Sequence, residues 1–161
     1  FVSKEDFAAQ AVELYAAAIH AQLDAVLADA SRPPLARVRT FFELAAQKYA
    51  AEGYLGCFLG ALGQELSGTS ELFRHKIEGC LASIVDRIAG CLEEARAEGA
   101  LAPSTDPRQL AEVLVNCWEG AALRTRLRRS PDPLHAVLDF YFHAAAPAPP
   151  AASAARLIGS P

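Results

Sequence analysis

The sequence contains no methionine, and aromatic residues make up only 8% of its 161 positions. Because translation begins with methionine and this chain begins with Phe1, we expect it to be part of a longer polypeptide. No apolar run reaches the roughly 18 residues that a transmembrane helix needs. No basic and apolar leader precedes a small-residue cleavage site either. The sequence therefore predicts no membrane partner, and we expect a cytoplasmic protein.

The charge balance argues against a self-sufficient nucleic-acid binder. Fifteen Lys and Arg residues stand against nineteen Asp and Glu residues, and the formal net charge is −4. Such binders usually carry a basic excess on one face. The four histidines are far apart and show no metal-ligand spacing. We therefore expect neither a metal nor a cofactor.

The sequence is rich in Ala, Leu, Glu and Arg, which favour helices. It has no long stretch in which apolar and polar residues alternate, as they would in a half-buried strand. Apolar residues recur every three or four positions between breaks, which indicates amphipathic helices. This pattern predicts an all-α single domain with six helices, at about residues 3–30, 33–53, 57–66, 71–98, 107–129 and 131–145.

Capping residues support several of these boundaries. A helix start at Ser3 is followed by acidic residues in the first turn, and Asp106 precedes a proline that suits a first helical position. Ser130 and Pro131 repeat this arrangement, while Gly99 suits a helix C-terminus. Residues 146–161 are rich in Ala and Pro, and we expect a flexible tail there.

Four cysteines are present, and all of them fall within helical apolar patterns rather than in short loops. Reduced, packed thiols therefore fit better than a disulfide framework, which mainly serves chains too small for a core. They are Cys57, Cys80, Cys91 and Cys117.

Five stretches together resemble the TetR (tetracycline repressor) family, most closely its repressors that respond to acrylate or to reactive electrophiles. They are FVSKEDF at 1–7, GCFLGALGQEL at 56–66, DPRQLA at 106–111, WEGA at 118–121 and SPDPL at 130–134. The resemblance implies a homodimeric transcriptional repressor that is released from DNA by a small molecule or an electrophile. It also implies that residues 1–3 are the end of a helix-turn-helix domain and that 4–145 form the effector-binding and dimerisation domain. Operator DNA would then be contacted only through the missing N-terminal domain.

Cys57 is the sharpest candidate for chemistry. It follows a glycine-containing turn at the start of the third predicted helix, where backbone N–H groups and the helix dipole can lower a thiol pKa. A thiolate there would attack acrylate-like or quinone-like electrophiles. In the resemblance, Cys57 matches a sensing cysteine, and Arg126 stands where a partner lysine is found. Arg126 can stabilise a thiolate but cannot serve as an amine partner. The alternative is that Cys57 is a small core residue.

Other residues are candidates for the effector pocket or for the core. Trp118 lies in the middle of an otherwise small-residue and aliphatic helix, and pockets between helices are mostly apolar. Arg124 or Arg126 could pair with a carboxylate effector, or both could simply complement the helix C-terminus. The resemblance adds residues of the second and third helices, namely Phe42, Tyr49, Phe58 and Leu62.

The last two predicted helices are apolar on more than one side, so they should be buried on more than one side. We expect an isologous interface between two subunits. It would involve Ala111, Val115, Gly120, Ala122, Leu134, Val137, Leu138 and Tyr141. Two other functions stay open at this point: a small all-α enzyme with Cys57 as nucleophile, and a purely structural helical dimer.

Overall fold

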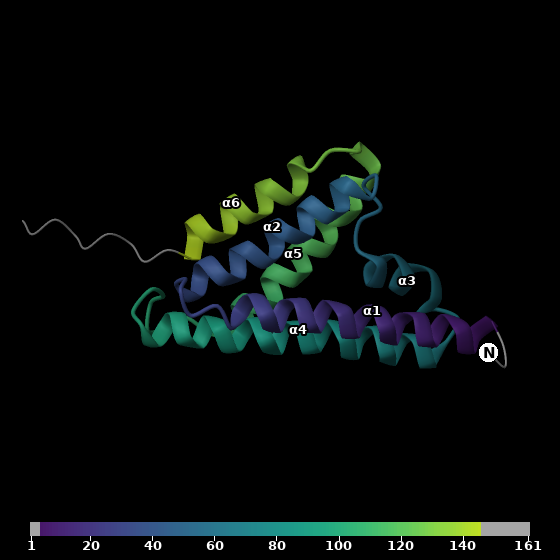
Figure 1. The fold of residues 1–161 in the computed structure, drawn as a ribbon, viewed down its shortest axis with the longest axis horizontal. Helices are drawn as coiled ribbons and strands as arrows, with labels where there is room; N and C mark the ends of the chain where they lie inside the picture. The colour runs from purple at the N-terminus through teal and green to yellow at the C-terminus, as the bar shows by residue number, and fades with distance from the viewer. Residues whose placement is uncertain (1–3, 146–161) are drawn as a thin grey trace, which may run out of the picture.

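A computed structural model describes residues 4–145, which form six α-helices (Figure 1). No strand occurs among these residues, so the predicted all-α fold is confirmed. The Ser3 cap, the proposed 1–3 remnant and the 146–161 tail lie outside the described residues. The helices are α1 (Lys4–Leu27), α2 (Pro34–Ala51), α3 (Phe58–Leu66), α4 (Glu71–Ala97), α5 (Pro107–Arg128) and α6 (Asp132–Ala145).

Side-chain caps and one glycine set the helix ends where the sequence places them. The Asp106 carboxylate accepts the backbone N–H groups of Arg108 and Gln109, at 3.0 and 3.2 Å, before Pro107 opens α5. Gly99 follows α4 with φ of +78°, a conformation that favours glycine. The last helix begins at Asp132, one residue later than predicted, after a turn held by its N–H bonded to Ser130 Oγ.

The buried Arg37 side chain joins three helices at one end of the domain. Its guanidinium donates to the carbonyl oxygens of Leu27 at 2.7 Å and Arg32 at 3.0 Å, and it pairs with Glu94 of α4 at 3.0 Å. The α1 helix ends at Leu27 rather than near Ala30. Arg37 thus satisfies a carbonyl group that the end of α1 leaves free.

The helices pack in two groups around a shared core. The two long helices α1 and α4 run side by side, α2 and α5 pack against them, and α6 packs on the far side of α2 and α5 (Figure 1). The short α3 packs against α4 near the N-terminal half of α1. An aromatic cluster joins α2 to α5, with the Phe42 and Trp118 ring centroids 4.8 Å apart and those of Tyr49 and Trp118 6.0 Å apart.

Candidate functional site

A tight turn between α2 and α3 delivers Cys57 to the side of α5. Gly53, Tyr54 and Gly56 all adopt positive φ, of +75°, +64° and +77°. A Cβ on Gly56 would lie 3.1 Å from the Ala122 carbonyl oxygen, so this position needs glycine for its conformation and for its closeness to α5. The thiol that follows is therefore fixed against α5.

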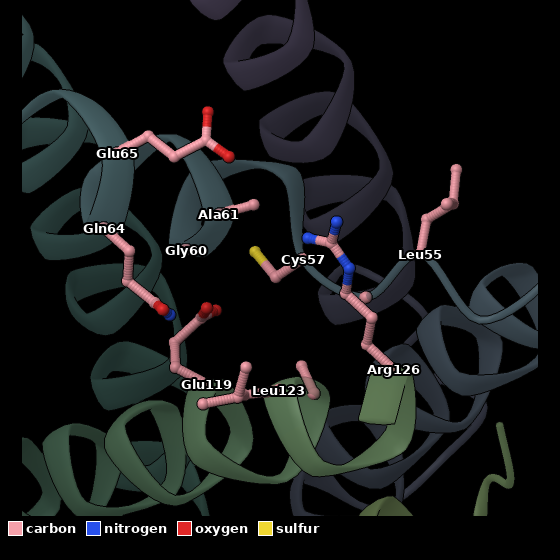
Figure 2. Close-up of a pocket in the computed structure, with 11 residues that line it drawn as sticks. Leu55, Cys57, Gly60, Ala61, Gln64, Glu65, Glu119, Leu123 and Arg126 are labelled. Carbon is pink, nitrogen blue, oxygen red and sulfur yellow. The ribbon is translucent and has the colours of Figure 1, made fainter. Parts of the chain in front are cut away.

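An open pocket lies between α3 and α5, with about 430 Å³ of empty space including its mouth (Figure 2). Its cavity volume is about 80 Å³, which has room for a small molecule but is below the roughly 300 Å³ of drug-sized sites. Glu119 and Arg126 rise from α5 on the two sides of Cys57. The lining residues are Leu55, Gly56, Cys57, Gly60, Ala61, Gln64, Glu65, Glu119, Ala122, Leu123 and Arg126.

Cys57 is the N-cap residue of α3 and is buried. Its environment raises the pKa of the thiol to about 12, first through burial and then through the negative charge of Glu119. The Gly60 backbone N–H and the Tyr49 hydroxyl lie within hydrogen-bonding reach of the sulfur and act in the opposite direction. The predicted lowering of this pKa is therefore wrong, because burial and the carboxylate outweigh the start of a short helix.

Glu119 is half-buried and lies within hydrogen-bonding reach of the Cys57 thiol. Burial raises the pKa of its carboxyl group. Its Oε2 occupies the space that a side chain on Gly60 would need, so a Cβ there would overlap the carboxylate. Within residues 4–145 no cation pairs with Glu119, since the ion pairs of that range involve other carboxylates. Sequence reasoning gave Glu119 no place in the pocket, although a carboxylate directly after the buried Trp118 was a usable signal.

A second, more enclosed cavity lies behind the thiol and shares Cys57 and Glu119 with the first. Trp118 is only 4% exposed. The Tyr49 hydroxyl lies within hydrogen-bonding reach of the Trp118 indole, and burial raises the pKa of this hydroxyl. The cavity is lined by Ile19, Phe41, Phe42, Ala45, Tyr49, Cys57, Leu59, Leu81, Ile84, Val115, Trp118 and Glu119.

The structure thus brings five of the eight predicted ligand-binding residues to the two cavities. Phe42, Tyr49 and Trp118 line the inner one, Arg126 lines the outer one, and Cys57 lines both. The other three line neither cavity: Phe58 packs its ring against Tyr15, Leu62 packs on the core, and Arg124 is exposed.

A family model described as "Tetracyclin repressor-like, C-terminal domain" matches residues 34–141, about two thirds of the chain. The chain belongs to this TetR family. It is 40% identical over 136 residues to the transcriptional regulator AcuR of Cereibacter sphaeroides, which covers 84% of this chain and 62% of AcuR. It is also 29% identical over 147 residues to the HTH-type transcriptional repressor DhaR of a Mycobacterium species, covering 91% and 73%. The chain therefore spans less than two thirds of the length of AcuR.

Solved structures show the same TetR-type fold. The regulatory protein TetR from Rhodobacter sphaeroides superposes with a TM-score of 0.85 at 38% identity, covering 89% of this chain and 76% of that one. The reduced form of NemR from Escherichia coli gives 0.78 at 27% identity, covering 93% and 77%. The relatives named here are regulators of transcription rather than enzymes. No helix within 4–145 is long and apolar enough to cross a membrane.

The structure places most of the predicted dimer residues of this TetR-type domain inside its own core. Val137 is half-buried and Gly120 is exposed, whereas the other six are buried: Ala111, Val115, Ala122, Leu134, Leu138 and Tyr141. These six side chains have their packing partners within one subunit. The apolar side chains that α5 and α6 do expose are Val113, Leu123, Leu127 and Phe140, the last two 71% and 77% exposed.

Proposed function

We propose that this chain is the effector-binding and dimerisation domain of a TetR-type transcriptional repressor, and that its effector occupies the pocket between α3 and α5. The observation that carries the proposal is the convergence of Cys57, Glu119 and Arg126 on one pocket, which shares Cys57 and Glu119 with an aromatic cavity. Such a mixture of apolar walls and a few polar groups is typical of small-molecule sites. Operator DNA would be bound by a separate N-terminal domain, in the cytoplasm.

The helix α3, which forms one wall of this pocket, contacts the helix that would lead to that DNA-binding domain. Phe58, the first residue of α3, packs its ring against Tyr15 of α1 with centroids 4.9 Å apart. An effector that favours one position of α3 would therefore favour one position of α1. Repression is lost when the two DNA-binding domains of a dimer no longer match successive major grooves.

For the dimer, we propose that two subunits meet through the outer sides of α5 and α6. Leu127 and Phe140 are exposed there, and exposed apolar side chains that lie together on a surface mark sites of interaction with a partner. An isologous contact would cover the same residues on both subunits. Analytical ultracentrifugation should show a dimer at micromolar concentration, and a strict monomer would contradict this part of the proposal.

The effector part of the proposal is tested by thermal shift and intact-mass spectrometry with small unsaturated acids, aldehydes, amides and quinones. A ligand that raises the melting temperature of the wild type without changing its mass is a reversible effector. A mass increase that Cys57→Ala abolishes marks a covalent effector. Wild-type protein that shows neither response across the panel would count against an effector pocket, and turnover of a compound would favour the enzyme alternative.

A further inference from the structure

Three groups from three parts of the chain meet at the Cys57 sulfur. Tyr49 comes from α2, Gly60 supplies its backbone N–H from α3, and Glu119 comes from α5. A Cβ on Gly60 would contact both Glu119 Oε2 and the Cys57 Cβ, so the carboxylate and the thiol lie side by side in the pocket (Figure 2). The first two can donate hydrogen bonds to sulfur, whereas a carboxylate can only accept. The Tyr49 hydroxyl can also accept a hydrogen bond, but only the carboxylate of Glu119 is basic enough to take up the thiol proton.

The surroundings keep the thiol protonated in the resting protein. A thiol with a pKa of about 12 is ionised in only about one molecule in ten thousand at pH 8. The thiolate is nevertheless the nucleophile in thiol chemistry. A covalent reaction at Cys57 thus needs a group that removes the proton as the new bond forms.

We propose that Glu119 accepts the proton of Cys57 while the sulfur adds to an uncharged α,β-unsaturated carbonyl compound in the outer pocket. This inference rests on the proposed function, because it assumes that the pocket admits an effector. In the step, the S–H bond and the π component of the C=C bond break, and a bond forms between sulfur and the β-carbon. The proton moves to a Glu119 oxygen and then to the α-carbon. The product is a thioether, Glu119 is again ionised, and no oxidant or reductant is used.

The pocket wall indicates the uncharged class of compound. Leu55, Ala61, Ala122 and Leu123 give the wall an apolar part. A half-buried carboxylate beside the reacting sulfur repels an anion placed between them. Arg126 lines the same pocket and offers N–H donors to a carbonyl oxygen that gains charge during the addition.

The test measures the rate at which acrylamide labels Cys57 in the 161-residue chain, by peptide mass spectrometry. Exposed Cys117 in the same molecule serves as the internal reference. Proton acceptors of this kind contribute about 100-fold or more, so Glu119→Gln should slow labelling of Cys57 by at least about tenfold. The Cys117 rate should stay unchanged.

The sign of the effect separates proton transfer from simple electrostatics. Removing the negative charge of Glu119 lowers the thiol pKa, so Glu119→Gln would accelerate labelling if the carboxylate acted only by repulsion. An unchanged or faster rate therefore overturns the proposal. Glu112→Gln is the matched control, since Glu112 is an exposed carboxylate on the same helix α5 but does not line the pocket. It should leave the rate within about twofold of wild type.

The pH profile gives a readout that a merely structural role would not change. Wild-type labelling should rise as Glu119 ionises, above the ordinary range of a glutamate because burial raises its pKa, and then level off. Over that range the hydroxyls of Tyr15 and Tyr49 stay protonated, because burial raises the pKa of both. Glu119→Gln should instead show a steady rise toward the thiol pKa, and Glu119→Asp should recover part of the plateau.

Two further outcomes separate this inference from the proposed function. Circular dichroism and thermal melting of Glu119→Gln show whether the fold is kept. A reversible thermal shift without any labelling of wild-type Cys57 would refute proton transfer at Glu119 while supporting the effector pocket. If wild-type Cys57 is labelled and Glu119→Gln does not slow the labelling, proton transfer at Glu119 is also refuted.

Discussion

Replacing Gly60 with alanine tests the position of the Glu119 carboxylate directly. In a helix, alanine is favoured over glycine by about 0.5–1 kcal/mol. At Gly60, however, the added Cβ would overlap Glu119 Oε2, so the carboxylate must move by more than an ångström and leave the thiol. A hydrogen bond to a charged group contributes about 1.5–3 kcal/mol, part of which returns as hydration once Glu119 reaches water. We therefore expect Gly60→Ala to change the free energy of unfolding by less than about 1 kcal/mol, in either direction.

The matched control is Gly90→Ala in the middle of α4. Among the described residues, nothing lies within 4 Å of a Cβ at that position, so alanine should raise the free energy of unfolding by about 0.5–1 kcal/mol. Urea unfolding at one protein concentration measures both variants. The alkaline rise in Cys57 labelling should also move to lower pH in Gly60→Ala, because the negative charge has left the sulfur. If Gly60→Ala stabilises as much as Gly90→Ala and leaves that rise unchanged, Glu119 does not lie over Gly60.

Three other predictions concern the helix cap, the core and the thiol. Asp106→Ala removes the acceptor of two N–H groups at the start of α5 and should cost about 1 kcal/mol in urea unfolding. Leu134→Ala should cost about 2–5 kcal/mol, because this side chain is fully buried in one subunit; exposed Phe140→Ala should instead weaken the dimer in ultracentrifugation, with little change in unfolding. Because burial raises the Cys57 pKa from 9.0 to about 12, the folded state holds this proton more tightly and stability should fall as pH rises between these values. Cys57→Ala should reduce that fall, and an identical pH dependence in both proteins would contradict it.

The helix boundaries were predictable because they depend on residues close together in the sequence. The Asp106 cap, the proline after it and the glycine at position 99 each act within a turn of their own helix. The placement of Cys57 at the start of α3 followed from the same local signals. The end of α1 was less predictable, since it depends on Arg37, which lies ten residues beyond Leu27.

The chemistry of the site was not predictable in the same way, because it depends on contacts across the fold. Glu119 lies 62 positions after Cys57, and no local pattern shows that its carboxylate would reach the thiol. The inward side of α5 was also ambiguous, because small apolar residues occur all around that helix. In the folded domain Ala111, Val115 and Ala122 are buried in the core, whereas Leu123 is exposed.

The Arg37 contacts also determine how far a movement at the pocket would travel. They hold the Leu27 end of α1 to α2 and α4, so a rigid α1 would turn about that end as a pivot. With a rise of 1.5 Å per residue, Tyr15 lies about 18 Å from the pivot and Lys4 about 35 Å from it. A displacement of Tyr15 by α3 would therefore produce a displacement about twice as large at Lys4, so α1 would amplify a small movement at the pocket.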